Sequence, residues 1–429
     1  MGKEDLSRII AFRQLKKEIR GSKDYLIIGI DIGKSTHHAF LGTATGRRLR
    51  RLVVENSASG FEHLLTMVQF FSDREGLEKR VFGVEPTSVY HKPLAEFLID
   101  NGFFVVYVTN EAIKKNRALL DGRWDKNDTK DAANVADLIS QGKCQYYDLP
   151  EMNLRDVRSL LLLRRRLKKQ LHSTRMRIRN NLVAQYFPEL DKSWNKYEAE
   201  NLAIVRWCLS PHKMEKLKFE DFCRMVVPQY RTEKQYERIF KIWANSPYSI
   251  GCQAGIALDL EAKILVEALR DVQEQIVEVE ETVEDICLCF NDYKLLLTIP
   301  GFGPYISAVV LAAIGNPFRF QNAKELIRLS GYDLNANRSG KSSNTAVPVI
   351  SKKGKADLRY ALYQAALIAT SFNTNFGAYF HKLLKGRERE KGIRTKVRVK
   401  IAAKLLVIAW TLMKNKESFD PYYIKLKIS

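Results

Sequence analysis

The sequence contains no C-x-x-C pair, and its six cysteines are scattered over 429 residues. Without such a pair a structural zinc site is not expected, and free thiols are typical of a reduced compartment. No apolar run reaches the roughly 18 residues that a transmembrane helix needs. The first residues carry frequent charges and lack the apolar core of a secretory signal peptide. We therefore expect a cytoplasmic protein with no membrane span.

Acidic residues are also scarce relative to basic ones. The chain has 49 Asp and Glu against 70 Lys and Arg, which gives a formal net charge of +21. This excess favours a polyanionic partner, because basic side chains displace condensed counterions from a phosphate backbone. A basic but otherwise ordinary soluble protein is the alternative. Since 45% of the residues are hydrophobic, folded cores are possible throughout, and the length suggests two or three domains.

Residues 24–150 predict an α/β domain. Apolar, β-branched runs at 25–33, 80–86 and 103–109 are typical of buried strands, and HHAFLGTA and RLRRLVVEN add two more. Helices are expected at SGFEHLLTMVQFFSD, at HKPLAEFLIDNG, and at about 110–120 and 128–141. Three strands followed by alternating helices and strands is the order of an RNase H-like fold, a mixed sheet with helices on its faces.

Residues 151–292 predict two long coiled-coil helices, separated by a helical insertion at about 186–254 to which we assign no role. The first helix carries ten basic residues and one acidic residue between 153 and 185. Its apolar stripe comprises Leu160, Leu163, Leu167, Leu171, Ile178 and Leu182.

The second long helix, at 256–290, follows a heptad pattern and is acidic. Its seam comprises Leu258, Ala262, Leu265, Leu269, Val272, Ile276, Val279, Val283 and Ile286. Ten acidic residues lie between 259 and 285 against two basic ones. This helix could pair with the basic helix or with its own copy in a dimer.

Four carboxylates of the α/β domain are candidate metal ligands. Asp31 and Glu85 end the first and fourth strands, which are neighbours in an RNase H-like sheet, and Asp128 and Asp131 share one helix face. Phosphodiester cleavage builds charge on two oxygens, and two Mg²⁺ ions held by carboxylates from different elements can stabilise both. Each residue also has a local alternative: a turn residue, an edge-of-sheet charge or a helix N-cap.

Two other phosphate-binding patterns are weaker. The GKS at 33–35 would need glycine at position 28 to complete a P-loop, and that position is Ile28. GIDIGKST also resembles the first phosphate loop of the actin and sugar-kinase group, but no convincing second loop follows. An ATPase of that type is a distant alternative.

Residues 293–415 predict a helical C-terminal domain. Its segment 299–303 matches the hairpin of a helix-hairpin-helix motif, in which Gly301 and Gly303 would bare backbone N–H groups to a phosphate. A helix–helix turn that requires glycine is the alternative.

A polar loop in the same domain offers a nucleophile. Ser339 stands between Arg338 and Gly340, and nearby cations would stabilise phosphate charge during attack. A plain polar loop is the alternative, and Ser342 and Ser343 are equal rivals. The cations expected to contact nucleic acid here are Arg338, Lys341, Lys352 and Lys353.

These motifs carry a family resemblance. GIDIGKSTHHAFL, VFGVEPTSVYHKPLAEFL and KNDTKDAANVADLI resemble the three N-terminal blocks of the DEDD transposases of IS110/IS1111 insertion sequences, and Lys126 fits the third block. TIPGFGPYISAVVLAAIG and LIRLSGYDLNANRSGKS resemble their C-terminal transposase domain. The blocks span both ends of the chain in the expected order. The sequence LNANRSG, however, replaces the proline-rich sequence that usually precedes the serine in this family.

The resemblance implies a RuvC-like domain in which Asp31, Glu85, Asp128 and Asp131 bind Mg²⁺ or Mn²⁺. It also implies that Ser339 forms a covalent phosphoserine link to DNA, with carboxylates and serine from different subunits completing one site. Members of the family act as homo-oligomers, so a dimer or tetramer is expected. Many use a structured guide RNA that pairs with donor and target DNA.

Basic stretches at 153–185 and 381–404 would then hold RNA or DNA. The candidates on the first are Arg164, Arg165, Arg166, Lys168, Lys169, Arg175, Arg177 and Arg179. The predicted function is a transposase that cleaves and rejoins DNA. A site-specific invertase of the same family would share these residues, and a RuvC-like junction nuclease would not need Ser339. A non-enzymatic RNA-binding relative would lack the carboxylates.

Overall fold

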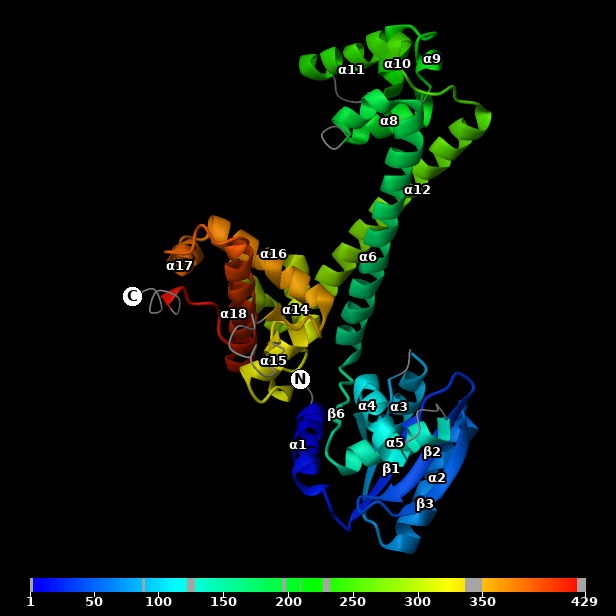
Figure 1. Ribbon diagram of the computed structural model, residues 1–429, viewed down its shortest axis with the longest axis vertical. Coiled ribbons are helices and arrows are strands. Elements are labelled where there is room, and N and C mark those ends of the chain that lie inside the picture. Colours follow the sequence, from blue (N-terminus) through cyan, green and yellow to red (C-terminus); the bar gives the residue numbers. More distant parts are fainter. Residues whose placement is uncertain are drawn as a thin grey trace, which may run out of the picture. The chain divides into compact units, whose positions relative to one another are not determined.

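The computed structural model describes residues 3–86, 89–121, 128–194, 198–208, 210–226, 232–335 and 349–422. The chain divides into two compact units (Figure 1). Unit 1 comprises Met1–Glu151 with Asn316–Gln321, and unit 2 comprises Met152–Gly315 with Asn322–Ser429. Unit 1 is a mixed α/β domain and the described part of unit 2 is almost entirely helical, which confirms the predicted division into fold classes.

Unit 1 is built on a six-stranded sheet of order β3-β2-β1-β4-β5-β6. Strand β1 pairs antiparallel with β2 and parallel with β4, so the first and fourth strands are neighbours, as predicted. The two-residue β6 at the sheet edge was not predicted. The strands are β1 (Tyr25–Asp31), β2 (Thr36–Thr43), β3 (Arg48–Glu55), β4 (Lys79–Val84), β5 (Phe104–Tyr107) and β6 (Gln145–Tyr146).

Helices cover both faces of this sheet. On one face, apolar residues of α2 and α3 join Ile28, Ile30 and Phe82 in a buried core. On the other, α1, α4 and α5 contribute to a second core with Ile27 and Val81. Helix α1 precedes the predicted 24–150 domain but belongs to the same compact unit. The helices are α1 (Lys3–Glu18), α2 (Ala58–Glu75), α3 (His91–Asp100), α4 (Asn110–Asp121) and α5 (Asp128–Ser140).

Two glycines let α5 lie directly on the sheet. A Cβ at Gly29 of β1 would stand 2.3 Å from the carbonyl oxygen of Ala132 and 2.5 Å from the amide nitrogen of Ala136. A Cβ at Gly83 of β4 would meet the Ile139 side chain at 2.0 Å. The missing side chains therefore fix how closely α5 approaches β1 and β4.

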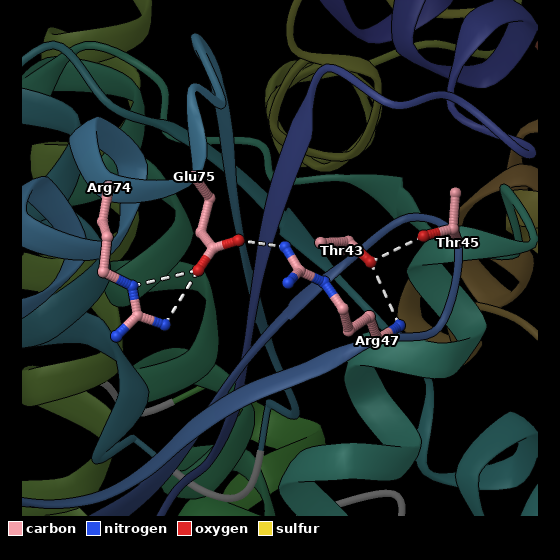
Figure 2. Close-up of polar contacts among 5 residues, drawn as sticks. All are labelled: Thr43, Thr45, Arg47, Arg74 and Glu75. Atoms are coloured by element: carbon pink, nitrogen blue, oxygen red, sulfur yellow. Dashed lines mark hydrogen bonds and ion pairs between the residues drawn. The ribbon is translucent and has the colours of Figure 1, made fainter.

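A polar cluster ties the β2–β3 hairpin to the end of α2 (Figure 2). The Arg47 amide donates to Thr43 Oγ1 at 3.0 Å, and its guanidinium pairs with Glu75. Glu75 also accepts from Arg74 Nη2 at 2.8 Å. Thr43 pairs with Leu26 whereas His38 pairs with Asp31, so this cluster lies at the opposite end of β2 from the candidate carboxylates.

Unit 2 is organised around two long antiparallel helices, α6 (Met152–Arg177) and α12 (Ile256–Leu288), which lie side by side (Figure 1). Eight of the nine predicted seam residues of α12 are buried; at the last step Cys287 is buried instead of Ile286. On α6 the predicted stripe is wrong at Leu163, which is 40% exposed. Arg164 donates to Glu280 at 2.6 Å, so the acidic helix pairs with the basic helix of its own chain.

The insertion is helical, as predicted, and it shares a hydrophobic core with α12. Trp194, Phe222 and Ile239 are buried together with Leu258 and Leu269 of α12. Beyond α6 the chain forms η1 (Ile178–Val183), α7 (Ala184–Tyr186), η2 (Pro188–Ser193), α8 (Glu198–Cys208), α9 (Pro211–Met214), α10 (Phe219–Val226), α11 (Glu233–Asn245) and η3 (Ser246–Tyr248).

The C-terminal part of unit 2 is a bundle centred on α14, α16 and α18, whose buried faces are rich in alanine and leucine. None of the helices in the described ranges is long and apolar enough to span a membrane. The elements are α13 (Asn291–Leu297), α14 (Pro304–Ile314), α15 (Ala323–Ser330), β7 (Leu334–Asn335), β8 (Val349–Ile350), α16 (Ala356–Phe372), α17 (Thr374–Leu384) and α18 (Ile393–Asn415). Between α14 and α15, η4 (Pro317–Arg319) belongs to unit 1.

Candidate active site and nucleic-acid interface

Strand alternation directs Asp31 and Glu85 to the same face of the sheet. In β1, Ile28 and Ile30 join the core under α2 and α3, so Asp31 lies on the opposite face with Ile27. In β4, Val84 joins that first core, and the next residue, Glu85, therefore shares the face of Asp31. The Glu85 amide donates to Ile30 O at 3.3 Å, which continues the pairing of β1 and β4 to the site.

A cavity of about 620 Å³ opens at the carboxyl ends of these strands. Asp31, Glu85 and Asp131 all line it, so three of the four predicted carboxylates are brought to one place. Asp128 is the first residue of α5, one turn before Asp131, and its side chain lies outside the described residues. In open α/β sheets the carboxyl ends of the strands are the usual position of a ligand site.

Asp131 is held by a residue that sequence reasoning missed. Its side chain is 2% exposed and receives two hydrogen bonds from Arg117 of α4, Nε to Oδ1 and Nη2 to Oδ2, both at 2.8 Å. Nothing in the sequence distinguishes this arginine from the other cations of α4, because the pairing depends on how α4 packs against α5.

Buried amides fix that packing of α4 against α5. Asn116 Nδ2 donates to Asn134 Oδ1 and to Asp137 Oδ2, each at 2.7 Å. Asn134 Nδ2 in turn donates to the Ile113 carbonyl oxygen at 2.9 Å. Satisfied buried networks of this kind are rigid, so the position of Asp131 relative to the sheet is well defined.

Further side chains complete the cavity lining. The cations Lys34 and Lys114 border it beside Arg117, and so does His38. The adjacent His37 is buried on the other face of the sheet, where it stacks on Phe61, and burial lowers the pKa of its imidazole. The cavity thus combines clustered carboxylates with cations, an arrangement that can hold both a metal ion and a phosphate.

The donor set fits a hard divalent cation in its chemistry. Carboxylate oxygens from β1, the end of β4 and α5 are the ligands that Mg²⁺ and Mn²⁺ prefer. Among the side chains that the structure describes, no three are already arranged to hold a metal ion. The Asp131 oxygens face Arg117 instead.

The basic stripe of α6 divides into two groups. Several of its cations form ion pairs within unit 2: Arg164 and Lys168 with Glu280, and Arg165 with Asp357. Arg179, which follows in η1, is paired with Asp191. Arg164 also stacks on the Tyr305 ring at 3.7 Å. Arg166, Lys169 and Arg177 are exposed, while Arg175 is half-buried. The paired Arg165 and Lys168 are exposed as well, so the cations accessible to a phosphate backbone come from both groups.

A groove of about 1280 Å³ runs along this helix within unit 2. Its walls come from α6, α14 and α16, with Arg165, Lys168 and Lys169 beside the exposed Tyr360. No sequence signal pointed to it, because the three helices are far apart in the chain.

The predicted hairpin connects α13 to α14, but its two glycines differ. Gly301 has φ +87°, and a Cβ there would stand 2.3 Å from the Ala365 carbonyl oxygen of α16. The close packing of α16 therefore explains why position 301 is glycine. Gly303 is the N-cap of α14 and has nothing within 4 Å of its Cβ position. The N-terminus of α14 is therefore the part of the hairpin that a phosphate could approach.

The predicted nucleophile loop is described only at its edges. Ser339, its rivals Ser342 and Ser343, and the cations Arg338 and Lys341 lie outside the described residues. Lys352 and Lys353 are described and exposed.

Comparisons with known proteins point to one group. Residues 28–188 match a DEDD transposase model of the IS110 type, and residues 293–381 match a model described as transposase IS116/IS110/IS902 family. A pilin gene-inverting protein of Moraxella bovis is 28% identical over 158 residues, which are 35% of this chain and 47% of that protein. The match thus spans about half the length of that relative.

Two insertion-element proteins align over nearly the whole chain. The 43.6 kDa protein of IS110 from Streptomyces coelicolor is 22% identical, covering 92% of this chain and 95% of the relative. The 44.8 kDa protein of IS116 from Streptomyces clavuligerus is 21% identical, covering 93% and 97%. Since the two models concern one family and together match more than half of the sequence, this chain belongs to the IS110/IS116/IS902 family of transposases.

Proposed function

We propose that this protein is a DNA transposase that cleaves and rejoins the strands of an insertion sequence with a metal-assisted carboxylate site. The observation that carries the proposal is the convergence of Asp31, Glu85 and Asp131 on one cavity. Asp128, one turn before Asp131 on α5, completes the proposed set of ligands for Mg²⁺ or Mn²⁺. The metal would supply charge stabilisation at the attacking and leaving oxygens.

The chain's own residues divide the remaining work. Asp31 and Glu85 are held by adjacent strands and provide fixed oxygens, while Asp131 is set by the α4–α5 packing. Lys34 and Lys114 border the cavity, where they would neutralise a phosphate of the substrate. Partners of this activity are donor and target DNA, and we extend the proposal to a homo-oligomer and a structured guide RNA.

Ser339 is proposed as the nucleophile. Its hydroxyl oxygen would attack a DNA phosphorus and lose its proton, and the departing sugar oxygen would take up a proton, leaving a phosphoserine link. We expect Ser339→Ala to block a covalent protein–DNA adduct, which is measured on denaturing gels after incubation with element-end DNA and Mg²⁺. Ser342→Ala and Ser343→Ala are the matched controls and should still form the adduct.

An adduct that persists in Ser339→Ala and maps to Ser342 or Ser343 would transfer the assignment to that residue. No adduct with any protein, alongside normal cleavage, would favour a RuvC-like junction nuclease, which needs the carboxylates only.

The nucleic-acid interface is proposed to include the exposed cations of α6 and the N-terminus of α14. We expect the triple change of Arg166, Lys169 and Arg177 to Ala to weaken DNA and RNA binding without loss of stability. Each lost phosphate contact should reduce the slope of log K against log salt by about 0.9 for duplex DNA. Binding measured by fluorescence anisotropy at several salt concentrations tests this.

Arg164→Ala is the matched control for that series. Arg164 is 16% exposed, paired with Glu280 and stacked on Tyr305, so its loss should cost about 1 kcal/mol of stability and leave the salt slope unchanged. An unchanged slope in the triple variant would remove these cations from the interface.

Site-specific inversion is the second candidate function, favoured by the similarity to the Moraxella pilin gene-inverting protein. Both activities would use the same carboxylates and serine. A plasmid carrying the flanking DNA of the gene in inverted orientation distinguishes them, because an invertase yields inverted segments and a transposase yields excised or inserted ones.

A further inference from the structure

Arg117 occupies a special position in the proposed site. It borders the same cavity as Asp31 and Glu85, and its guanidinium holds both oxygens of Asp131. A metal cation that approaches the Asp131 oxygens would be repelled by the positive charge of Arg117, because like charges repel strongly at such short range. Arg117 and a metal ion are therefore competitors for Asp131.

The two partners of this ion pair differ in their freedom to move. Asp131 has a short side chain, is 2% exposed and sits on a helix locked by the Asn116–Asn134 contact. Arg117 has a long side chain that is 22% exposed and opens to the cavity. If the pair separates, Arg117 is the side that moves, and the cavity is the space open to it.

A planar guanidinium that leaves a carboxylate binds a phosphate with the same fork geometry. We propose that Arg117 is a positioning residue that couples metal binding to DNA binding: it holds Asp131 until metal arrives and then turns to a DNA phosphate in the same cavity. The inference rests on the proposed function, since it assumes a metal at the carboxylates. It follows that metal and DNA each strengthen the binding of the other, because linkage between two sites is reciprocal.

The test is direct Mn²⁺ binding to the full-length protein, measured from the electron paramagnetic resonance signal of free Mn²⁺ with and without duplex DNA of the element end. Without DNA, Arg117→Gln should bind Mn²⁺ more tightly than wild type, by a factor in the range of roughly 5 to 150 that is typical of coupling between sites. Adding DNA should tighten Mn²⁺ binding in wild type and leave Arg117→Gln nearly unchanged.

Lys114→Gln is the matched control. Lys114 lies one turn earlier on α4, borders the same cavity and carries the same charge, but no hydrogen bond or ion pair joins it to Asp131. In the measurement without DNA, its removal should shift Mn²⁺ affinity much less than removal of Arg117. Arg117→Lys keeps the charge but loses the two-point contact, so its Mn²⁺ affinity should lie between those of wild type and Arg117→Gln. If the glutamine variant folds poorly, the lysine variant should still bind Mn²⁺ more tightly than wild type.

The outcomes distinguish a failure of the proposed metal site from a failure of the proposed coupling through Arg117. If Asp31→Asn and wild type both fail to bind Mn²⁺ with or without DNA, and Arg117→Gln also fails, the metal site is wrong and the coupling falls with it. If wild type binds Mn²⁺ but Arg117→Gln binds equally or more weakly, the competition is refuted while the site stands. Equal tightening by Lys114→Gln would also refute it, because the effect would then be general electrostatics.

Discussion

Replacing Asp31 with Asn is expected to abolish DNA strand cleavage while leaving nucleic-acid binding nearly intact. Asn has almost the same volume as Asp, so β1 and the cavity should keep their shape, but the neutral amide is a poor ligand for a hard divalent cation. A bound metal contributes several kcal/mol of charge stabilisation in the transition state, and about 1.4 kcal/mol is a factor of ten in rate. The cleavage rate should therefore fall by roughly a thousandfold or more.

Glu85→Gln should behave in the same way, because Glu85 shares the cavity and the sheet face of Asp31. Chain geometry offers close controls. Asp24→Asn makes the identical change just before β1, at the opposite end of the strand, and Glu78→Gln makes it just before β4. Both residues are exposed, so both variants should cleave at the wild-type rate.

Cleavage is followed with labelled element-end DNA in Mg²⁺, and binding is followed separately by gel shift. Retained binding is expected because the exposed cations of α6 belong to unit 2, whereas the carboxylates belong to unit 1. Wild-type cleavage by either Asp31→Asn or Glu85→Gln would exclude that carboxylate from the site.

Much of unit 1 could be predicted because its signals are local. Apolar runs ended by Gly or Pro mark β1 and β4, and side-chain alternation then decides which face Asp31 and Glu85 occupy. The heptad of α12 likewise reports burial along one helix face, and eight of its nine positions are buried. These features depend on neighbours within a few residues of each other.

Features that depend on distant partners escaped prediction. The sequence does not distinguish Arg164 from Arg166, but of these two arginines only Arg164 is paired with Glu280 of α12. Leu163 was placed in the apolar stripe of α6, yet it is 40% exposed, while the neighbouring Arg164 is 16% exposed against Glu280 of α12. The pair of Arg117 with Asp131 depends on the docking of α4 against α5, which no spacing rule encodes.

The second large effect is expected from replacing Gly29, because α5, which carries Asp131, packs directly on this residue. A Cβ there would overlap the backbone of α5 at Ala132 and Ala136, and no side-chain rotation can relieve a clash with backbone atoms. Gly29→Ala should therefore push α5 away from β1, carrying Asp131 away from Asp31. Overpacking of this kind costs about 1–3 kcal/mol or more, and cleavage should be lost as well.

Gly83 is the matched control, since it lies in register with Gly29 on the neighbouring strand. A Cβ at Gly83 would clash with Ile139 Cδ1 at 2.0 Å, which is the far end of a flexible side chain. Its other near neighbours, Ile139 Cγ1 at 3.2 Å and Val135 Cγ1 at 3.3 Å, are also side-chain atoms. Gly83→Ala should thus cost less, and adding Ile139→Val, which removes that atom, should recover part of the loss. No such second change is available for Gly29.

Urea unfolding measures the two glycine variants, with circular dichroism and intrinsic fluorescence recorded together because two units need not unfold in one step. DNA binding through unit 2 should survive in Gly29→Ala, which would show that the loss of cleavage does not come from loss of the whole fold. Wild-type stability with wild-type cleavage in Gly29→Ala would mean that α5 does not press on β1. Our explanation of how Asp131 comes close to Asp31 and Glu85 would then be wrong, because it requires that position 29 carries no Cβ atom.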